Sequence, residues 1–274
     1  MVLSAGLANA GNLPDSALYA GLGGSLNSVS YRDQSVWALG ISDVYSTSTH
    51  ELLASGTADG PPVNVNLSTE TALGPNAQIG YFRKFDDPAY LWGGKFTYAY
   101  PSASSTTSPF LIPQYGSFGT TPFTGNALVQ SYQSTLQQQA SFLPYLGKSF
   151  QDGFAYLGIG PTLSQVTSKV NGVVGFADIN GQRGDISGAP QSFTKNNWVG
   201  GWQAGIGGTY FFDRTWFLDL SYTYGRTAHY TADLGGAFTN VSASSGRTYV
   251  GNLIGTASGY LITNAIALTV NKTF

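Results

Sequence analysis

The stretch that decides the fold is GYLITNAIALTVNKTF, residues 259–274, in which large apolar side chains alternate with small or polar ones. Successive side chains of a β-strand point to opposite faces, so a repeat of two residues predicts a strand with two different faces. The apolar face carries Tyr260, Ile262, Ile266, Leu268, Val270 and Phe274, and the other carries Thr263, Ala265, Ala267, Thr269, Asn271 and Thr273. Phe274 is still in phase, so the strand is expected to continue to the last residue.

The end of this strand resembles the closing strand of bacterial outer-membrane β-barrels, whose final Phe is part of the signal read by the barrel-insertion machinery. The resemblance implies an assembly signal formed by Phe274, Val270 and Leu268. Many such ends carry a second aromatic residue two positions before the last, where this chain has Lys272. The rest of the chain is therefore searched for further strands.

The composition favours a protein whose surface meets lipid. Of 274 residues, 42% are hydrophobic and 14% aromatic, but only 9% are charged. Soluble domains carry about 25% charged residues, and no apolar run here approaches the roughly 18 residues that a membrane helix needs. Because every backbone polar group in hydrocarbon needs an internal partner, a closed β-barrel is the remaining way to span a bilayer.

Charge and cysteine content exclude several other classes of protein. The net charge of −2 gives no electrostatic reason to expect a nucleic-acid partner. The chain has no Cys, which excludes a disulfide scaffold, thiolate metal sites and thiol nucleophiles. No group of carboxylates has the spacing of a metal or glycosidase site, so neither a metal nor a cofactor is expected.

Residues 1–10, MVLSAGLANA, are predicted to be the remnant of a secretory signal peptide, because they are short, apolar and end in an Ala-x-Ala cleavage pattern. No basic residues precede them, so the start codon is expected upstream. The alternative is a small-residue terminus without structure. On the first interpretation, residues 11–274 form a single barrel domain.

Seven further segments alternate in the same way and are predicted to be strands. They are centred on residues 18–30, 77–85, 91–100, 135–150, 154–168, 196–212 and 216–233. Three short turns are expected at 86–88, 151–153 and 213–215. Four long polar loops are expected at 35–76, 101–133, 170–195 and 234–258.

Short and long connections alternate along the chain, as in outer-membrane barrels with short periplasmic turns and longer extracellular loops. The predicted fold is therefore an all-β, transmembrane, antiparallel up-and-down β-barrel of eight strands with both termini periplasmic. Eight strands close the sheet and leave no free edge. A barrel of ten or more strands is the alternative, if the segments near 36–45 and 63–67 pair in the membrane.

The assigned faces predict which polar and aromatic residues meet the lumen and the lipid. A Lys or Arg at mid-depth on the lipid face costs about 2–4 kcal/mol, and no charge falls there. A polar network in the lumen is predicted from Lys95, Asp219, Lys84 and Gln203. Aromatic girdles at the two membrane interfaces are predicted from Trp92, Trp198, Trp202, Trp216, Tyr210 and Tyr260.

Pro144 and Pro161 fall within predicted neighbouring strands, almost opposite each other. A closed barrel has no edge at which a missing N–H is harmless. A shared bulge or a local break in the hydrogen-bond ladder is therefore expected between these strands.

Catalysis is not expected. Some eight-stranded outer-membrane enzymes deacylate lipid A with a His and Ser pair, and only His229 with Thr231 or Asp233 could imitate that set here. The His-x-Ser arrangement of that family is absent. A solvated or hydrogen-bonded His is the preferred interpretation, and an outer-membrane lipid hydrolase is kept as the least favoured function.

Residues 18–274 as a whole resemble the family of eight-stranded outer-membrane barrels that includes the opacity-type and outer-membrane-protein-A-like proteins of Gram-negative bacteria. The resemblance implies a non-enzymatic protein with a structural and interaction role, which supports the envelope and displays loops outward. Its implied partners are outer-membrane lipids and lipopolysaccharide, the barrel-assembly machinery, and surface or envelope proteins. Because side chains fill an eight-stranded barrel, free diffusion is not expected, and a narrow porin-like channel is the alternative.

Deletion of Phe274 is expected to impair membrane assembly more than the substitution Lys272→Ala, because Phe274 belongs to the implied signal whereas Lys272 is a snorkelling side chain at the interface. The measurement is the fraction of each variant that migrates as a folded, heat-modifiable species in the outer-membrane fraction. Equal insertion of the two variants would contradict this assignment.

Overall fold

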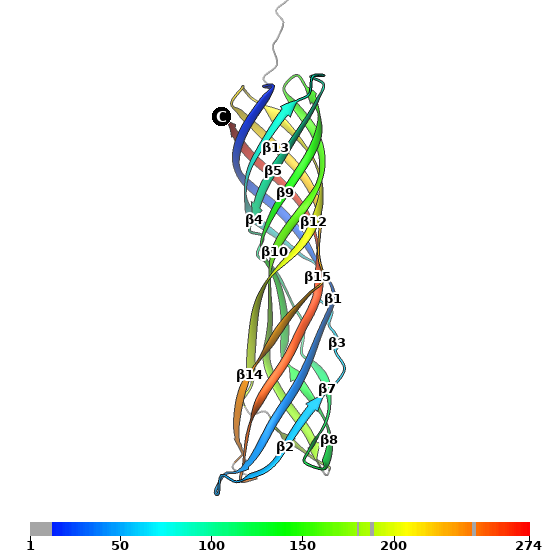
Figure 1. The fold of residues 1–274 in the computed structure, drawn as a ribbon, viewed down its shortest axis with the longest axis vertical. Helices are drawn as coiled ribbons and strands as arrows, with labels where there is room; N and C mark the ends of the chain where they lie inside the picture. The colour runs from blue at the N-terminus through cyan, green and yellow to red at the C-terminus, as the bar shows by residue number, and fades with distance from the viewer. Residues whose placement is uncertain (1–12, 180, 187–188, 243–244) are drawn as a thin grey trace, which may run out of the picture.

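The computed structural model describes residues 13–179, 181–186, 189–242 and 245–274. These residues form antiparallel strands joined by turns (Figure 1). No helix long and apolar enough to cross a membrane occurs among them. Residues 1–10, the predicted signal remnant, lie outside the described residues.

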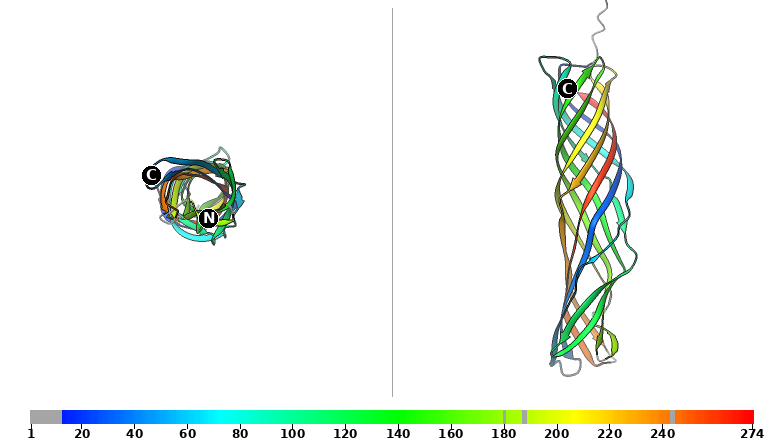
Figure 2. Two further views of the ribbon diagram at one scale, coloured as in Figure 1. Left: turned by 90° about the horizontal axis from the view of Figure 1, so that it is seen from below. Right: turned by 90° about the vertical axis from the view of Figure 1, so that its right-hand side faces the viewer.

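Eight strands form a closed ring, which confirms the predicted barrel. In spatial order they pair as neighbours, and the first also pairs with the last, so the ring has no free edge (Figure 2, left). The ring consists of β1 (Ser16–Ser46), β4 (Glu70–Lys84), β5 (Tyr90–Ala99), β9 (Ser131–Phe150), β10 (Gly153–Ile179), β12 (Gln191–Phe211), β13 (Trp216–Thr227) and β15 (Arg247–Thr273).

The prediction of four long loops was wrong, because strands occupy most of residues 35–76, 101–133, 170–195 and 234–258. β1, β10, β12 and β15 run far into these ranges, and shorter strands continue the others. The shorter strands are β2 (Leu52–Asp59), β3 (Val63–Asn64), β6 (Ala103–Thr106), β7 (Phe110–Phe118), β8 (Thr121–Val129), β11 (Gln182–Asp185) and β14 (Tyr230–Ser242). The segments near 36–45 and 63–67 pair within this arrangement and add no strand to the ring.

The physical reason for this correction is that the alternation changes sense along the barrel. In β14, the buried face carries Tyr230, Ala232 and Leu234, while Thr231 and Asp233 are exposed. On the belt, large apolar side chains face outward instead, as with Ile266 and Leu268 on either side of Ala267. The extended strands therefore lack the lipid-facing pattern by which the others were found.

The result is a long tube (Figure 1 and Figure 2, right). β15 alone has 27 residues. At about 3.3 Å per residue and a tilt of about 40°, such a strand spans roughly 70 Å along the axis. We call the end with the turns at 85–89, 151–152 and 212–215 the proximal half, and the end formed by β2, β7, β8 and β14 the distal half.

The outer surface of the proximal half is an apolar belt. Its members are exposed and come from all eight strands of the ring: Leu22, Ile79, Phe96, Phe142, Leu157, Ile206, Leu220 and Leu268. A typical apolar belt of an outer-membrane barrel is about 25 Å tall. The tube is therefore more than twice as long as its belt, and the distal half extends beyond it.

Pro144 and Pro161 produce a break in the ladder without a bulge. β9 and β10 pair at Tyr145 with Gly158 and again at Ser141 with Thr162, in the same register, and no pair is formed between these points. The two prolines, which have no N–H, thus lie at the place where β9 and β10 do not pair with each other. On their other sides, Pro144 lies opposite Gly94 and Pro161 opposite Trp202.

One side of the distal half is held by side chains instead of a backbone ladder. Within the described ranges, β12 pairs with β13 as far as Gly201 opposite Thr227, and no register joins β12 to β14 beyond that point. The amide nitrogen of Asn197 donates to the carbonyl oxygen of Thr231 at 3.0 Å, and that of Gln191 to Ala237 at 3.4 Å. We call this line the β12–β14 seam.

Candidate functional site

The lumen of the barrel is the candidate functional site, because the inward faces of the strands bring most of the buried polar groups together there. Along β1, inward side chains change character from the proximal to the distal end. Tyr19 lies in an aromatic cluster, Asn27 lines a polar cavity, Val29 lies in an apolar layer, and Val36 lies in a second, distal apolar cluster. Each layer is built from several strands at one height.

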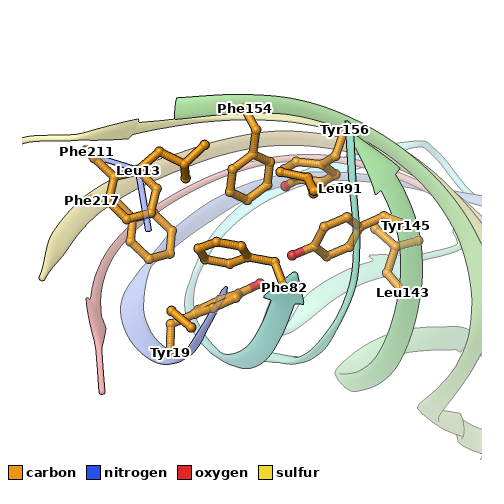
Figure 3. Packing of buried hydrophobic residues seen from close by; sticks show 11 residues of the cluster. Leu13, Tyr19, Phe82, Leu91, Leu143, Tyr145, Phe154, Tyr156, Phe211 and Phe217 are labelled. Carbon is orange, nitrogen blue, oxygen red and sulfur yellow. The ribbon is translucent and has the colours of Figure 1, made fainter. Parts of the chain in front are cut away.

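The first layer is an aromatic plug beside the short turns (Figure 3). Rings from different strands lie against one another: Phe211 stacks on Phe217 with 4.6 Å between ring centroids, and Tyr19 meets Phe217 edge to face at 5.2 Å. The buried members are Leu13, Ala17, Tyr19, Phe82, Leu91, Leu143, Tyr145, Phe154, Tyr156, Phe211 and Phe217. This end of the lumen is therefore filled by packed side chains.

A buried ion pair lies directly above the plug. The Lys95 ammonium of β5 is 2.9 Å from the Asp219 carboxylate of β13, and both side chains are 3% exposed. Tyr156 of β10 joins the pair: its hydroxyl donates to Asp219 at 2.7 Å and lies 2.6 Å from the Lys95 nitrogen. Three strands that are not neighbours are thus connected across the lumen.

The network continues onto β4 and β15. The amide nitrogen of Gln78 lies 3.0 Å from the Asp219 carboxylate and 2.7 Å from the carbonyl oxygen of the Asn271 side chain. The Asn271 amide in turn donates to the hydroxyl of Thr269 at 3.0 Å. The carboxylate of Asp219 therefore has partners on three other strands, as a buried charge requires.

The structure separates the four residues predicted to form this network. Lys95 and Asp219 are in direct contact, and Gln203 is buried and lines the cavity above them. Lys84 lies at the proximal end, where its ammonium is 3.1 Å from Asp15 and 3.2 Å from the carbonyl oxygen of Leu13. Lys84 has the predicted inward parity on β4, but it lies nearer to the proximal end than the plug and does not reach the network.

Sequence reasoning missed Gln78, Tyr156 and Asn271 as members of the network. Each has inward parity on its strand, which was a usable signal. Their heights relative to Lys95 depend on the stagger between strands, which alternation within one strand does not reveal. The missing information was therefore the register.

A polar cavity of about 470 Å³, counting its open space, lies above the ion pair. Its walls include Ser25, Asn27, Asn76, Gln139 and Ser221. The next layer is apolar and crosses the full lumen with buried side chains of seven strands: Val29, Tyr31, Ala103, Leu136, Val166, Val199, Tyr230 and Leu261. The polar cavity is thus bounded by the ion-pair network, with the aromatic plug behind it, on one side and by this apolar layer on the other.

The aromatic residues predicted for the interfaces lie on the outer surface at two heights. Tyr210, Trp216 and Trp92 are exposed near the short turns. Trp202 and Trp198 lie eight and twelve residues from Tyr210 on β12, which corresponds to roughly 20–30 Å along the axis at about 3.3 Å per residue and a tilt of about 40°. Two bands of aromatic side chains therefore flank the apolar belt.

Cations accompany these bands. The guanidinium of Arg226 lies 4.3 Å from the ring centroid of Tyr260. At the other end, the Lys272 ammonium lies 5.6 Å from the Trp216 ring and 5.9 Å from the Phe274 ring. Both arrangements fit side chains whose apolar stem meets the belt and whose charge meets water.

His229 does not form a catalytic arrangement with its neighbours. It is exposed between β13 and β14, with its ring 6.4 Å from that of Tyr260. Thr231 and Asp233 are exposed on β14, and none of the hydrogen bonds found among the described residues joins them to His229. No cluster of three His, Asp or Glu side chains that could hold a metal ion occurs in the described part of the chain.

Removing one partner of the buried ion pair is expected to destabilise the barrel more than removing both. Lys95→Met or Asp219→Leu alone leaves a buried group without its counterpart and should cost about 3–5 kcal/mol, whereas the two substitutions together should cost less than either. Urea unfolding in lipid vesicles measures these free energies. The exposed Lys148→Met is the control, and additive losses in the double variant would contradict the coupling.

No protein-family model matches the chain, and no curated protein matches it. Among solved structures it is similar to outer membrane protein OprG from Pseudomonas aeruginosa, with 12% identity over 90% of this chain and 95% of that chain and a TM-score of 0.34. It is also similar to neisserial surface protein A, with 13% identity over 89% of this chain and 99% of that chain and a TM-score of 0.29. A third similar structure is Ail, the attachment invasion locus protein of Yersinia pestis, with 13% identity over 87% of this chain and 98% of that chain and a TM-score of 0.24.

These low identities and TM-scores carry no argument about the lumen or the activity of this chain. The fold is established by the pairing of its own strands, in which β1 meets both β4 and β15. On that basis, the chain has the closed eight-stranded antiparallel architecture of the small outer-membrane β-barrels.

Proposed function

We propose that the chain is an integral outer-membrane barrel with a structural and interaction role, which supports the envelope and holds its distal half outside the bilayer. The single observation that carries this proposal is an apolar belt, bordered by two aromatic bands, around a lumen filled with side chains. In a soluble barrel the belt would be exposed to water, which is strongly unfavourable for so large an apolar surface.

The lumen supports a structural role because it is built for rigidity. The aromatic plug, the ion pair of Lys95 with Asp219 and the apolar layer around Val29 each connect several strands. The plug and the apolar layer fill the lumen with packed side chains at two heights. A rigid, closed barrel suits an anchor for the part that extends beyond the lipid.

The distal half supports the interaction role. Its outer face exposes polar side chains, such as Thr231 and Asp233 of β14, and two of its connections among the described residues, 47–51 and 119–120, are short turns. Surface recognition is favoured where a rigid scaffold presents such turns. The proposed partners are lipopolysaccharide and surface or envelope proteins, with the turns near 47–51 and 119–120 on the extracellular side and both termini in the periplasm.

The orientation is testable because the chain has no Cys. We expect Ser48→Cys, in the exposed turn between β1 and β2, to react with a membrane-impermeant maleimide on intact cells. The matched variant Asp86→Cys, in the exposed turn between β4 and β5, should react only after lysis, because it faces the periplasm. Labelling of Asp86→Cys but not Ser48→Cys on intact cells would reverse the orientation.

A narrow channel is the second candidate, and the polar cavity above Lys95 is the observation that favours it. The cavity walls resemble those of an aqueous pore in being rich in Ser, Thr and Asn. Conduction would require both adjoining apolar layers to open, which costs the contacts of their packed rings.

The purified barrel in planar bilayers is therefore expected to show no steady single-channel openings. A general porin, inserted in parallel under the same conditions, confirms that openings are detectable. Heat-modifiable migration of the recovered protein confirms that it remained folded. Reproducible openings of one fixed conductance would show that the layers do not seal the lumen and would favour the channel.

A further inference from the structure

The distal half has an apolar interior, and polar side chains are interspersed with apolar ones on its exterior. Inside, Val36, Ile112 and Leu234 are buried in one cluster. Outside, the Trp37 indole nitrogen donates to Asp59 at 2.9 Å, and the Ser55 hydroxyl donates to Asp43 at 2.6 Å. The distal exterior therefore carries polar contacts that the belt lacks, although it continues the same sheet.

An apolar cavity occupies this interior. It comprises about 840 Å³ of space between atoms, counting its open mouth, and its accessible walls are almost entirely apolar. The walls come from strands around the whole ring and include Val36, Ile112, Val129, Val170, Leu234 and Phe238.

The few polar side chains at the wall do not prepare it for water. Gln114 is buried, and its amide nitrogen donates to the backbone oxygens of Ala38 at 3.1 Å and Pro113 at 3.0 Å. A buried water needs two to four polar partners, and cavities without them stay dry and take up apolar molecules. The cavity therefore favours an apolar occupant over water.

Packing around the cavity leaves room that the sequence could have filled. A Cβ atom built at Gly40, an inward position of β1, would contact only a methyl carbon of Leu253, at 3.9 Å. Gly40 pairs regularly with β15 and β2, so no turn or bulge explains a glycine there. Where no bulge or bend is present, a strand glycine can leave space for a ligand or another backbone to approach closely.

The β12–β14 seam provides access. Phe193 of β12 and Leu234 of β14 both line the cavity, on the two sides of the line where the backbone ladder is missing. Separation of β12 from β14 breaks the side-chain hydrogen bonds of Gln191 and Asn197. It breaks no backbone ladder, because none joins the described residues of the two strands along this line. At the distal end the wall is closed instead by stacked rings of Phe118 and Phe123, 5.2 Å apart.

We propose that the distal half binds one small, uncharged apolar molecule, a single aromatic ring or a short alkyl chain, in the cavity beside Gly40. Eight-stranded barrels have an interior of the size that holds one small ligand. A charged ligand is disfavoured because its charge would be buried without a partner. This binding is independent of the proposed anchoring role.

Benzene is the probe, added to the full chain in lipid nanodiscs with Ile, Leu and Val methyl groups isotopically labelled. Methyl resonances of Val36, Ile112 and Leu234 are expected to shift with a saturating dependence on benzene concentration. Methyls of the belt, such as those of Leu157 and Leu268, should shift linearly, because benzene also partitions into lipid. This contrast separates a site from partitioning.

Gly40→Leu is expected to abolish the saturating shifts by filling the cavity. Gly200→Leu is the matched control, because Gly200 is exposed on β12 and a Cβ there meets nothing within 4 Å; it should bind benzene as the unchanged chain does. Should Gly40→Leu fail to fold, Ala38→Leu serves the same purpose from the next inward position. Absence of saturating shifts in the unchanged chain would overturn the proposal, as would equal binding by a folded cavity-filling variant.

Discussion

The structure depends on the antiparallel pairing of β1 with β15. This pairing joins the first and last strands along nearly their whole length, from Tyr19 opposite Thr273 to Ser46 opposite Arg247. Backbone N–H and C=O groups in lipid have no water to bind, so a sheet can lie there only when its edges are joined. Closure at this line permits the apolar belt, and the belt in turn confines polar side chains to the lumen.

The same closed sheet serves two environments. In the proximal half, apolar side chains face outward and the lumen holds an aromatic plug and the ion pair of Lys95 with Asp219. In the distal half, Val36 and Leu234 face inward and polar residues face out. β1, β10, β12 and β15 run without interruption between the two halves, and shorter strands continue the others.

The lumen shows how a narrow barrel handles a buried charge. Asp219 accepts hydrogen bonds from Lys95, Tyr156 and Gln78, which come from three different strands. Such a pair stabilises the folded state little by itself, since desolvation offsets much of the attraction. Its clear structural effect is to connect strands that are not neighbours in the barrel, at one height between the plug and the polar cavity.

The sequence by itself determined the strand number and the faces of the belt, because alternation is local and a lipid-facing strand shows it plainly. The inward parity of Lys95 and Asp219 was also visible in single strands. Their direct contact was not, because it depends on the stagger and curvature of the sheet, and the same stagger placed Lys84 elsewhere.

The tertiary structure alone decided that residues 35–76, 101–133, 170–195 and 234–258 are largely wall instead of loop. Polar residues beside turn-forming residues are predicted as loops when only their composition is considered. Proline strengthens that prediction, yet Pro113 lies inside β7 and Pro122 inside β8. These strands form because neighbouring strands supply hydrogen-bond partners and a shared apolar interior. Both are long-range interactions that no single stretch of sequence contains.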